Sequence, residues 1–128
     1  MLSTNLHSEE GHQRCLFDWV DLQIKRYPQL ALLFAIPNGG YRHKTTAAVL
    51  KATGAKPGVP DLLLAWPAGG FHGLFIEMKR PKKGSSPAGV LSPEQKDWIE
   101  RLRKAGYRVE VCYGFDQARQ TLLEYIAS

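Results

Sequence analysis

The chain has 128 residues, 44% of them hydrophobic, and carries a formal net charge of +5 with a sequence pI of about 9.4. This length allows one hydrophobic core, so we expect a single domain over residues 1–128. The sequence has no run of about 18 apolar residues and no secretion signal at its start, which predicts a soluble cytoplasmic protein. The excess of basic over acidic residues suits a polyanionic partner such as a nucleic acid.

The N-terminal part of the chain predicts a helix, a strand and a second helix. Apolar residues at helical spacing follow Ser8, which caps the first helix, and Pro28 ends it. The continuous apolar run from Leu30 to Ile36 predicts a central strand. A loop over 37–42 then leads to a short helix over about 44–53.

Two apolar segments, 58–64 and 74–79, flank a turn rich in Pro and Gly and predict an antiparallel hairpin. Its symmetric register pairs residues whose numbers sum to 138, which sets Asp61 opposite Glu77. Directly opposed residues share a face, with Cβ atoms roughly 4.5 to 5.5 Å apart. Lys79 falls on the same face because side chains alternate along a strand.

The C-terminal half predicts a loop followed by a helix, a strand and a helix. Residues 80–90 are rich in Pro, Gly, Ser and Lys and indicate a loop. Ser92 caps the next helix, with Gln95 at the capping-box position. Alternation over 107–113 predicts a strand, and 116–126 forms the last helix. The order α-β-α-β-β-α-β-α predicts an α/β fold in which helices flank a mixed β-sheet.

The charged residues of the predicted hairpin indicate a metal site. Two opposed carboxylates repel each other unless a cation lies between them. Asp61 and Glu77 offer oxygen ligands, which suit a hard ion such as Mg²⁺ or Mn²⁺. Such an ion activates water and offsets phosphate charge, while Lys79 stabilises developing negative charge. The sequence therefore predicts phosphodiester hydrolysis; an edge-strand Asp with a surface Glu-Lys pair is the alternative.

Pro60-Asp61 followed by Glu77-Met78-Lys79 resembles the PD-(D/E)XK signature of the restriction-endonuclease-like nucleases. A wider set of residues, in the same order, resembles the VRR-Nuc (virus-type replication-repair nuclease) family. The set comprises Glu10 with Gln13, Ile36-Pro37-Asn38-Gly39-Gly40, Gly54-Ala55-Lys56-Pro57-Gly58-Val59-Pro60-Asp61, Ile76-Glu77-Met78-Lys79 and Leu91-Ser92-Pro93-Glu94-Gln95. The resemblance covers nearly the whole chain and implies a restriction-endonuclease-like fold with Mg²⁺- or Mn²⁺-dependent nuclease activity.

The resemblance also implies roles for residues beside the predicted metal ligands. It implies that the backbone carbonyl of Met78 is a third ligand. Gln95 would then position the attacking water near Lys79, although the capping box alone also explains a glutamine there.

A glutamate on the first helix is a further candidate ligand, directly or through water. The resemblance places a metal-proximal glutamate three residues before a glutamine, and Glu10 with Gln13 fits this spacing. Glu9 is the alternative, and its neighbour three residues on is His12. The helix dipole by itself also favours an acidic residue in the first turn.

Several residues around the hairpin are candidates for DNA contacts. Asn38-Gly39-Gly40 either lets a DNA backbone approach closely or forms a simple turn. The basic candidates are Arg42, Lys44, Lys56, Arg80, Lys82 and Lys83. A run of charges is also common on an ordinary solvated face.

Standalone members of the family that this chain resembles are phage and bacterial enzymes that cut branched DNA, above all four-way Holliday junctions. The resemblance therefore implies a repair-type DNA endonuclease in the cytoplasm of a bacterial or phage-infected cell. Two symmetric incisions from one site per chain imply a two-fold homodimer. The alternatives are a flap or non-specific DNA nuclease of the same fold, a restriction-type enzyme, and a DNA-binding module without catalysis.

Overall fold

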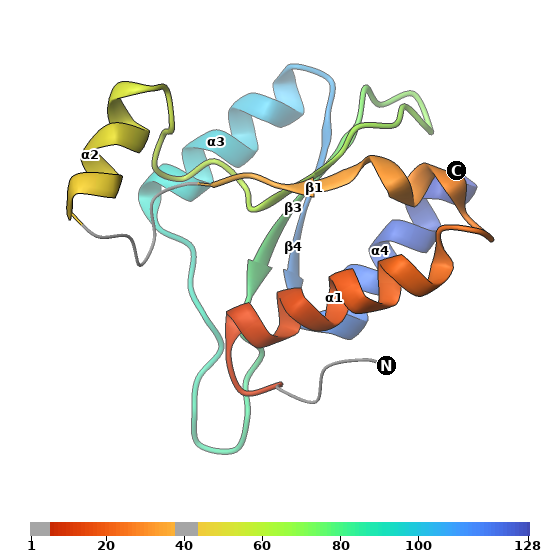
Figure 1. The fold of residues 1–128 in the computed structure, drawn as a ribbon, viewed down its shortest axis with the longest axis horizontal. Helices are drawn as coiled ribbons and strands as arrows, with labels where there is room; N and C mark the ends of the chain where they lie inside the picture. The colour runs from red at the N-terminus through yellow and green to blue at the C-terminus, as the bar shows by residue number, and fades with distance from the viewer. Residues whose placement is uncertain (1–5, 38–43) are drawn as a thin grey trace.

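The computed structural model describes residues 6–37 and 44–128. The elements in chain order are the helix α1 (Glu9–Gln23), the 3-10 helix η1 (Pro28–Leu32), β1 (Leu33–Ala35), α2 (Lys44–Ala52), β2 (Leu62–Leu64), β3 (Leu74–Lys79), α3 (Pro93–Lys104), β4 (Arg108–Tyr113) and α4 (Phe115–Ala127). In Figure 1, α1 and α4 lie on one side of the sheet and α3 lies on the other. The predicted α/β class is confirmed. Within the described ranges, no helix has the length and apolar character needed to cross a bilayer.

The sheet is mixed and has the strand order β1-β2-β3-β4. The pairs β1–β2 and β2–β3 are antiparallel, whereas β3–β4 is parallel. The pairing of Leu62 with Ile76 and of Leu64 with Leu74 keeps a sum of 138. The predicted hairpin register is therefore confirmed, and all six residues of β3 are buried.

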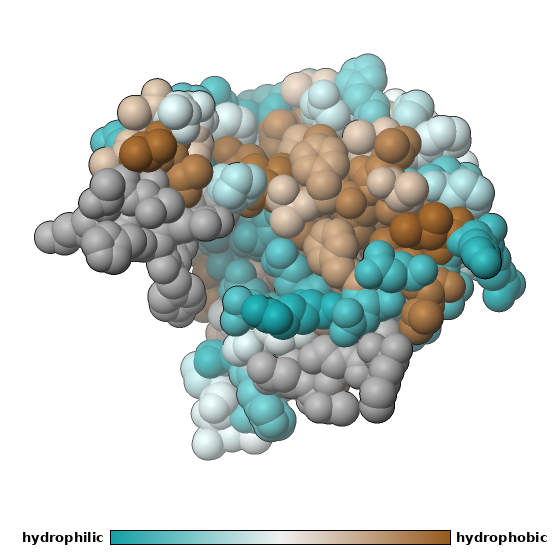
Figure 2. Space-filling model, viewed as in Figure 1, coloured by the Kyte–Doolittle hydropathy of each residue, from teal (hydrophilic) through white to brown (hydrophobic). Residues whose placement is uncertain are grey.

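The apolar run from Leu30 to Ile36 is not a central strand, so that prediction is wrong. Residues Pro28–Leu32 form η1, and β1 is a three-residue strand at the edge of the sheet. Pro28 fixes its own φ and suits the start of a tight helical turn, which shortens the strand. Phe34 is 47% exposed as a result. Figure 2 shows the apolar surface over this edge in brown.

The two faces of β3 have different partners. Ile76 and Met78 face α1 and α4 and belong to the main core with Leu16 and Leu122. The alternate residues of β3 face α3, where Phe75 packs in a second cluster with Ile99 and Val109. Because side chains alternate along a strand, the charged residues of β3 also lie on the α3 face.

Candidate active site

Three charged residues meet where β2 begins and β3 ends. Glu77 is 1% exposed and Lys79 is 8% exposed, and they lie two residues apart on β3. Asp61 directly precedes β2, and its Oδ2 accepts a hydrogen bond from the backbone N of Met78 at 2.8 Å. The structure thus brings together the Asp, Glu and Lys that the hairpin register predicted.

Pro60 explains why a backbone oxygen is available beside these carboxylates. The carbonyls of Gly73 and Lys79 accept hydrogen bonds from the β4 side, so the odd-numbered residues of β3 direct their backbone groups toward β4 and the even-numbered ones direct theirs toward β2. Continuing that register sets Met78 opposite Pro60, which has no N–H to donate. Asp61 takes the N–H of Met78 instead. The Met78 carbonyl therefore receives no hydrogen bond from the residue paired with it on the β2 side, and it points to the side of β3 on which Asp61 lies.

Gln95 ties the start of α3 to the charged pair on β3. Its Oε1 accepts from the backbone N of Ser92 at 2.8 Å and from Lys79 Nζ at 2.9 Å. Its Nε2 donates to Glu77 Oε1 at 3.1 Å. Lys79 Nζ also lies 3.9 Å from Glu77 Oε1. The predicted capping box is present, and the same amide holds both charged side chains in place.

The third acidic residue of the site is Glu9, and the expectation that Glu10 faces the site is wrong. Carboxylate oxygens of Glu9, Asp61 and Glu77 all lie within 4.8 Å of one another. The Glu10 side chain is 77% exposed and pairs with Arg14 at 3.5 Å. We call Glu9, Asp61 and Glu77 the acidic cluster.

The orientation of α1 explains why Glu9 rather than Glu10 points inward. His12 is 7% exposed, and its Nδ1 accepts a hydrogen bond from the backbone N of Phe115 at 2.9 Å, at the start of α4. Glu9, His12 and Leu16 follow one another at intervals of three and four and therefore share one face of the helix. His12, the residue three beyond Glu9, thus marks the buried side of α1.

Burial and mutual repulsion disfavour full ionisation of the acidic cluster. Burial, followed by the Asp61 carboxylate, raises the pKa of Glu77 to about 9, although Lys79 works in the opposite direction. Burial and then Asp61 also raise the pKa of Glu9, against the effect of Lys79. One lysine is therefore insufficient to keep the whole acidic cluster charged. A further cation would favour the charged form of these carboxylates.

The donor set fits a divalent metal ion. Glu77 Oε2 is buried and accepts no hydrogen bond from a donor group of the described residues, and the Glu77 carboxyl lies beside that of Asp61. The acidic cluster and the Met78 carbonyl together offer only oxygen atoms, the ligands that Mg²⁺ and Mn²⁺ prefer. A buried carboxylate oxygen without a partner is costly unless something binds it.

The loop before Asp61 passes close to the first turn of α3. Gly58 has a φ of +91°, and a Cβ there would lie 2.6 Å from the backbone C of Glu94. Only glycine tolerates both this conformation and this approach. Gly58 therefore lets the segment that carries Asp61 lie against the helix that carries Gln95.

The basic residues proposed to contact DNA have different surroundings. Arg80 Nη2 donates to the Pro87 carbonyl at 2.7 Å, and Lys83 Nζ lies 2.8 Å from His7 Nδ1. Lys56 and Lys82 are exposed. The remaining candidates, Asn38, Gly39, Gly40 and Arg42, lie outside the described residues, as does the side chain of Lys44 at the start of α2.

The mixed sheet lies between helical layers, with Asp61 directly before one strand and Glu77-Met78-Lys79 on the next. This arrangement defines a restriction-endonuclease-like nuclease fold. The sequence pattern of the VRR-NUC domain matches residues 13–116. A solved structure described as a VRR_NUC domain protein has 30% identity and a TM-score of 0.74, covering 94% of this chain and 88% of that one. A search of curated proteins found no match. The chain belongs to the VRR-NUC family of nuclease domains.

Proposed function

We propose that residues 1–128 form one metal-dependent DNA endonuclease domain, in which Asp61, Glu77 and the Met78 carbonyl hold Mg²⁺ or Mn²⁺. The observation that carries this proposal is the buried Glu77 carboxylate, whose Oε2 accepts no hydrogen bond from a donor group of the described residues and which lies against Asp61. A module that only binds DNA has no use for buried carboxylates that repel each other. Glu9 is a further ligand, directly or through water.

Each side chain around the acidic cluster has a distinct role. When bound, the cation offsets the charge of the phosphate and makes a coordinated water more acidic. Lys79 presents its ammonium group on the same face and stabilises negative charge that develops on the phosphate. Gln95 fixes this ammonium group through its Oε1 and orients Glu77 through its Nε2. Gln95 is thus a positioning residue, because both ends of its amide are already engaged.

Branched DNA, and in particular the four-way junction, is the proposed substrate, with the chain acting as a two-fold homodimer. Support comes from the membership of the chain in the VRR-NUC family and from its net charge of +5. Lys56 and Lys82 are exposed and suit phosphate contacts. Arg80 shapes the loop after β3 through its bond to Pro87. The cytoplasm of a bacterial or phage-infected cell is the proposed location.

The substrate is tested by incubating the purified protein with labelled four-way junction, flap and linear duplex DNA. We expect cleavage of the junction with Mg²⁺ or Mn²⁺ and none with EDTA. Absence of cleavage under every metal condition would contradict the nuclease proposal. Equal cleavage of junction and linear duplex would reject only the junction preference. A monomer in light scattering at micromolar concentration would count against the homodimer.

A matched pair of variants tests the place of Glu9 in the site. Glu9→Gln is expected to weaken Mn²⁺ binding and cleavage by about tenfold, within the range seen when groups around a metal are removed. Glu10→Gln is the control, because Glu10 is exposed and paired with Arg14. Isothermal titration with Mn²⁺ and single-turnover cleavage measure both effects. Equal behaviour of the two variants would remove Glu9 from the proposed site.

A further inference from the structure

The outer edge of β4 carries backbone groups that the sheet does not use. β4 is the last strand in the sheet, and Arg108 N donates to Gly73 O at 3.0 Å. The even-numbered residues of β4 therefore direct their backbone groups to β3. In a parallel ladder, alternate residues direct their N–H and C=O groups to opposite sides. Val109, Val111 and Tyr113 therefore direct theirs to the free edge.

Side chains cover both ends of this edge and leave its middle open. Arg103 Nη2 donates to the Val109 carbonyl at 2.7 Å. Gln117 Oε1 accepts from the backbone N of Tyr113 at 2.9 Å. Such capping protects an edge strand against unwanted pairing. Within the described ranges, no side chain bonds the N–H or C=O of Val111, which lies between the two caps.

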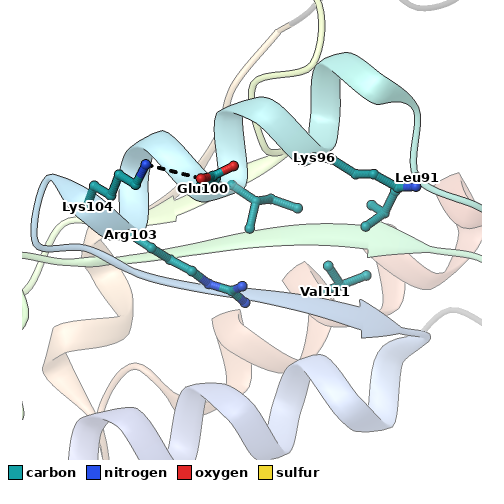
Figure 3. A pocket seen from close by; sticks show the side chains of 7 residues that line it. Leu91, Lys96, Glu100, Arg103, Lys104 and Val111 are labelled. Carbon is teal, nitrogen blue, oxygen red and sulfur yellow. Dashed lines mark ion pairs between the residues drawn. The ribbon is translucent and has the colours of Figure 1, made fainter.

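A cavity of about 380 Å³ opens beside the uncapped part of the edge. Its apolar lining consists of Leu91, Ile99 and Val111, and its remaining lining residues are Lys96, Glu100, Arg103 and Lys104. Figure 3 shows Val111 pointing from β4 toward α3, while Arg103 reaches from α3 down to β4. The acidic cluster contributes nothing to this lining, so the cavity is separate from the metal site.

The lining of the cavity has an excess of positive charge. Three cationic side chains face one carboxylate, Glu100, which pairs with Lys104 at 3.1 Å. Lys96 and Arg103 are left without a carboxylate in the lining. Carboxylates on an occupant would complement them.

We propose that the β4 edge and this cavity bind an extended segment of a partner protein, with alternating apolar side chains and acidic flanks. The segment pairs with Val111 as a fifth strand, and its alternate side chains enter the cavity because strand side chains have a period of two. A peptide supplies both the acceptor and the donor that Val111 needs, whereas DNA phosphates supply only acceptors. This binding site goes beyond the proposed nuclease function and does not depend on it.

The full chain is tested with a short fluorescent peptide in which valine alternates with threonine between flanking aspartates. Anisotropy is expected to show saturable binding, and hydrogen exchange is expected to slow at the Val111 amide. N-methylation of alternate peptide nitrogens, which blocks strand pairing, should weaken binding by about tenfold or more. Lys96→Glu should weaken it to a similar degree, whereas Lys25→Glu, an exposed lysine just after α1, should not.

Several outcomes would overturn the proposal. Equal affinity for the N-methylated peptide would reduce the interaction to charge attraction. An equal effect of Lys96→Glu and Lys25→Glu would place the peptide elsewhere. Displacement of the peptide by linear duplex DNA would assign the edge to DNA. If hydrogen exchange at the Val111 amide slows as the protein concentration rises, without any peptide, the edge would be assigned to a second copy of the chain.

Discussion

Glu77→Gln is expected to reduce metal-dependent cleavage by about a thousandfold or more, while raising the stability of the metal-free protein at neutral and alkaline pH. The loss of activity follows from the removal of a charged group from the proposed metal ligands. The gain in stability has a separate cause, because the amide needs no proton to stay neutral. Its oxygen can still accept from Gln95 Nε2, and its NH₂ group would replace the buried Oε2 beside Asp61.

The sign of the pH effect follows from the raised pKa of Glu77. Between its ordinary value of 4.5 and about 9, the folded metal-free protein keeps a proton that the unfolded chain releases. The free energy of unfolding therefore falls as the pH rises through this window, by about 1.4 kcal/mol per pH unit from this group. The contribution is fully present below pH 4.5 and is lost as the pH rises through the folded pKa. Glu77→Gln removes this slope.

Urea unfolding in EDTA at a series of pH values between 5 and 9 measures this effect, and single-turnover cleavage measures the activity. Glu124→Gln, an exposed acid on α4, is the control and should change neither quantity. Added Mn²⁺ should stabilise the wild type at high pH, since binding favours the folded state, and should stabilise Glu77→Gln much less. Retained activity in Glu77→Gln would contradict the proposed ligand set, and an unchanged pH slope would contradict the proton held by Glu77.

Lys79→Met is expected to lower the cleavage rate by about 100- to 1000-fold, the range found when a group that stabilises transition-state charge is removed. Methionine fills a similar buried volume but cannot bond Gln95 or offset charge on a phosphate. Because Lys79 opposes the raised pKa values of Glu77 and Glu9, its removal also shifts both pKa values further upward. Metal binding in this variant should therefore require a higher pH than in the wild type.

Single-turnover cleavage and Mn²⁺ titration at several pH values separate the two roles of Lys79. At a pH where the variant is saturated with metal, the rate should still be low, because the ammonium group is missing. Lys25→Met is the control for the loss of a lysine elsewhere on the surface. Recovery of the full rate on metal saturation would restrict Lys79 to metal binding.

Sequence reasoning identified the hairpin because strand alternation, the turn composition and the charged residues all agreed. A register in which Leu62 pairs with Ile76 places Asp61 beside Glu77 without further information. The capping box of α3 was also local, since Ser92 and Gln95 are three residues apart. The link from Gln95 to Lys79 and Glu77 was not local, because it depends on how α3 packs on the sheet.

The errors at Glu10 and at the first strand have identifiable causes. Spacing by three fits both Glu10 with Gln13 and Glu9 with His12, and only the buried contact of His12 with Phe115 decides between them. The interval of seven does not separate the two glutamates in the sequence, because Glu9 leads to Leu16 and Glu10 leads to Phe17, and both residues are apolar. A continuous apolar run does not distinguish a central strand from an edge, so the position of Leu33–Ala35 depended on tertiary pairing.

In the proposed active site, the position of Gln95 links the dynamics of a helix end to the chemistry. Terminal turns of helices open and close more readily than the interior of a protein. Fraying of the first turn of α3 would separate the Gln95 amide from Lys79 and Glu77 as well as from the backbone N of Ser92. The ordered site and the folded helix start thus share one set of hydrogen bonds, so the lifetime of the capped turn would limit the lifetime of the proposed reactive geometry.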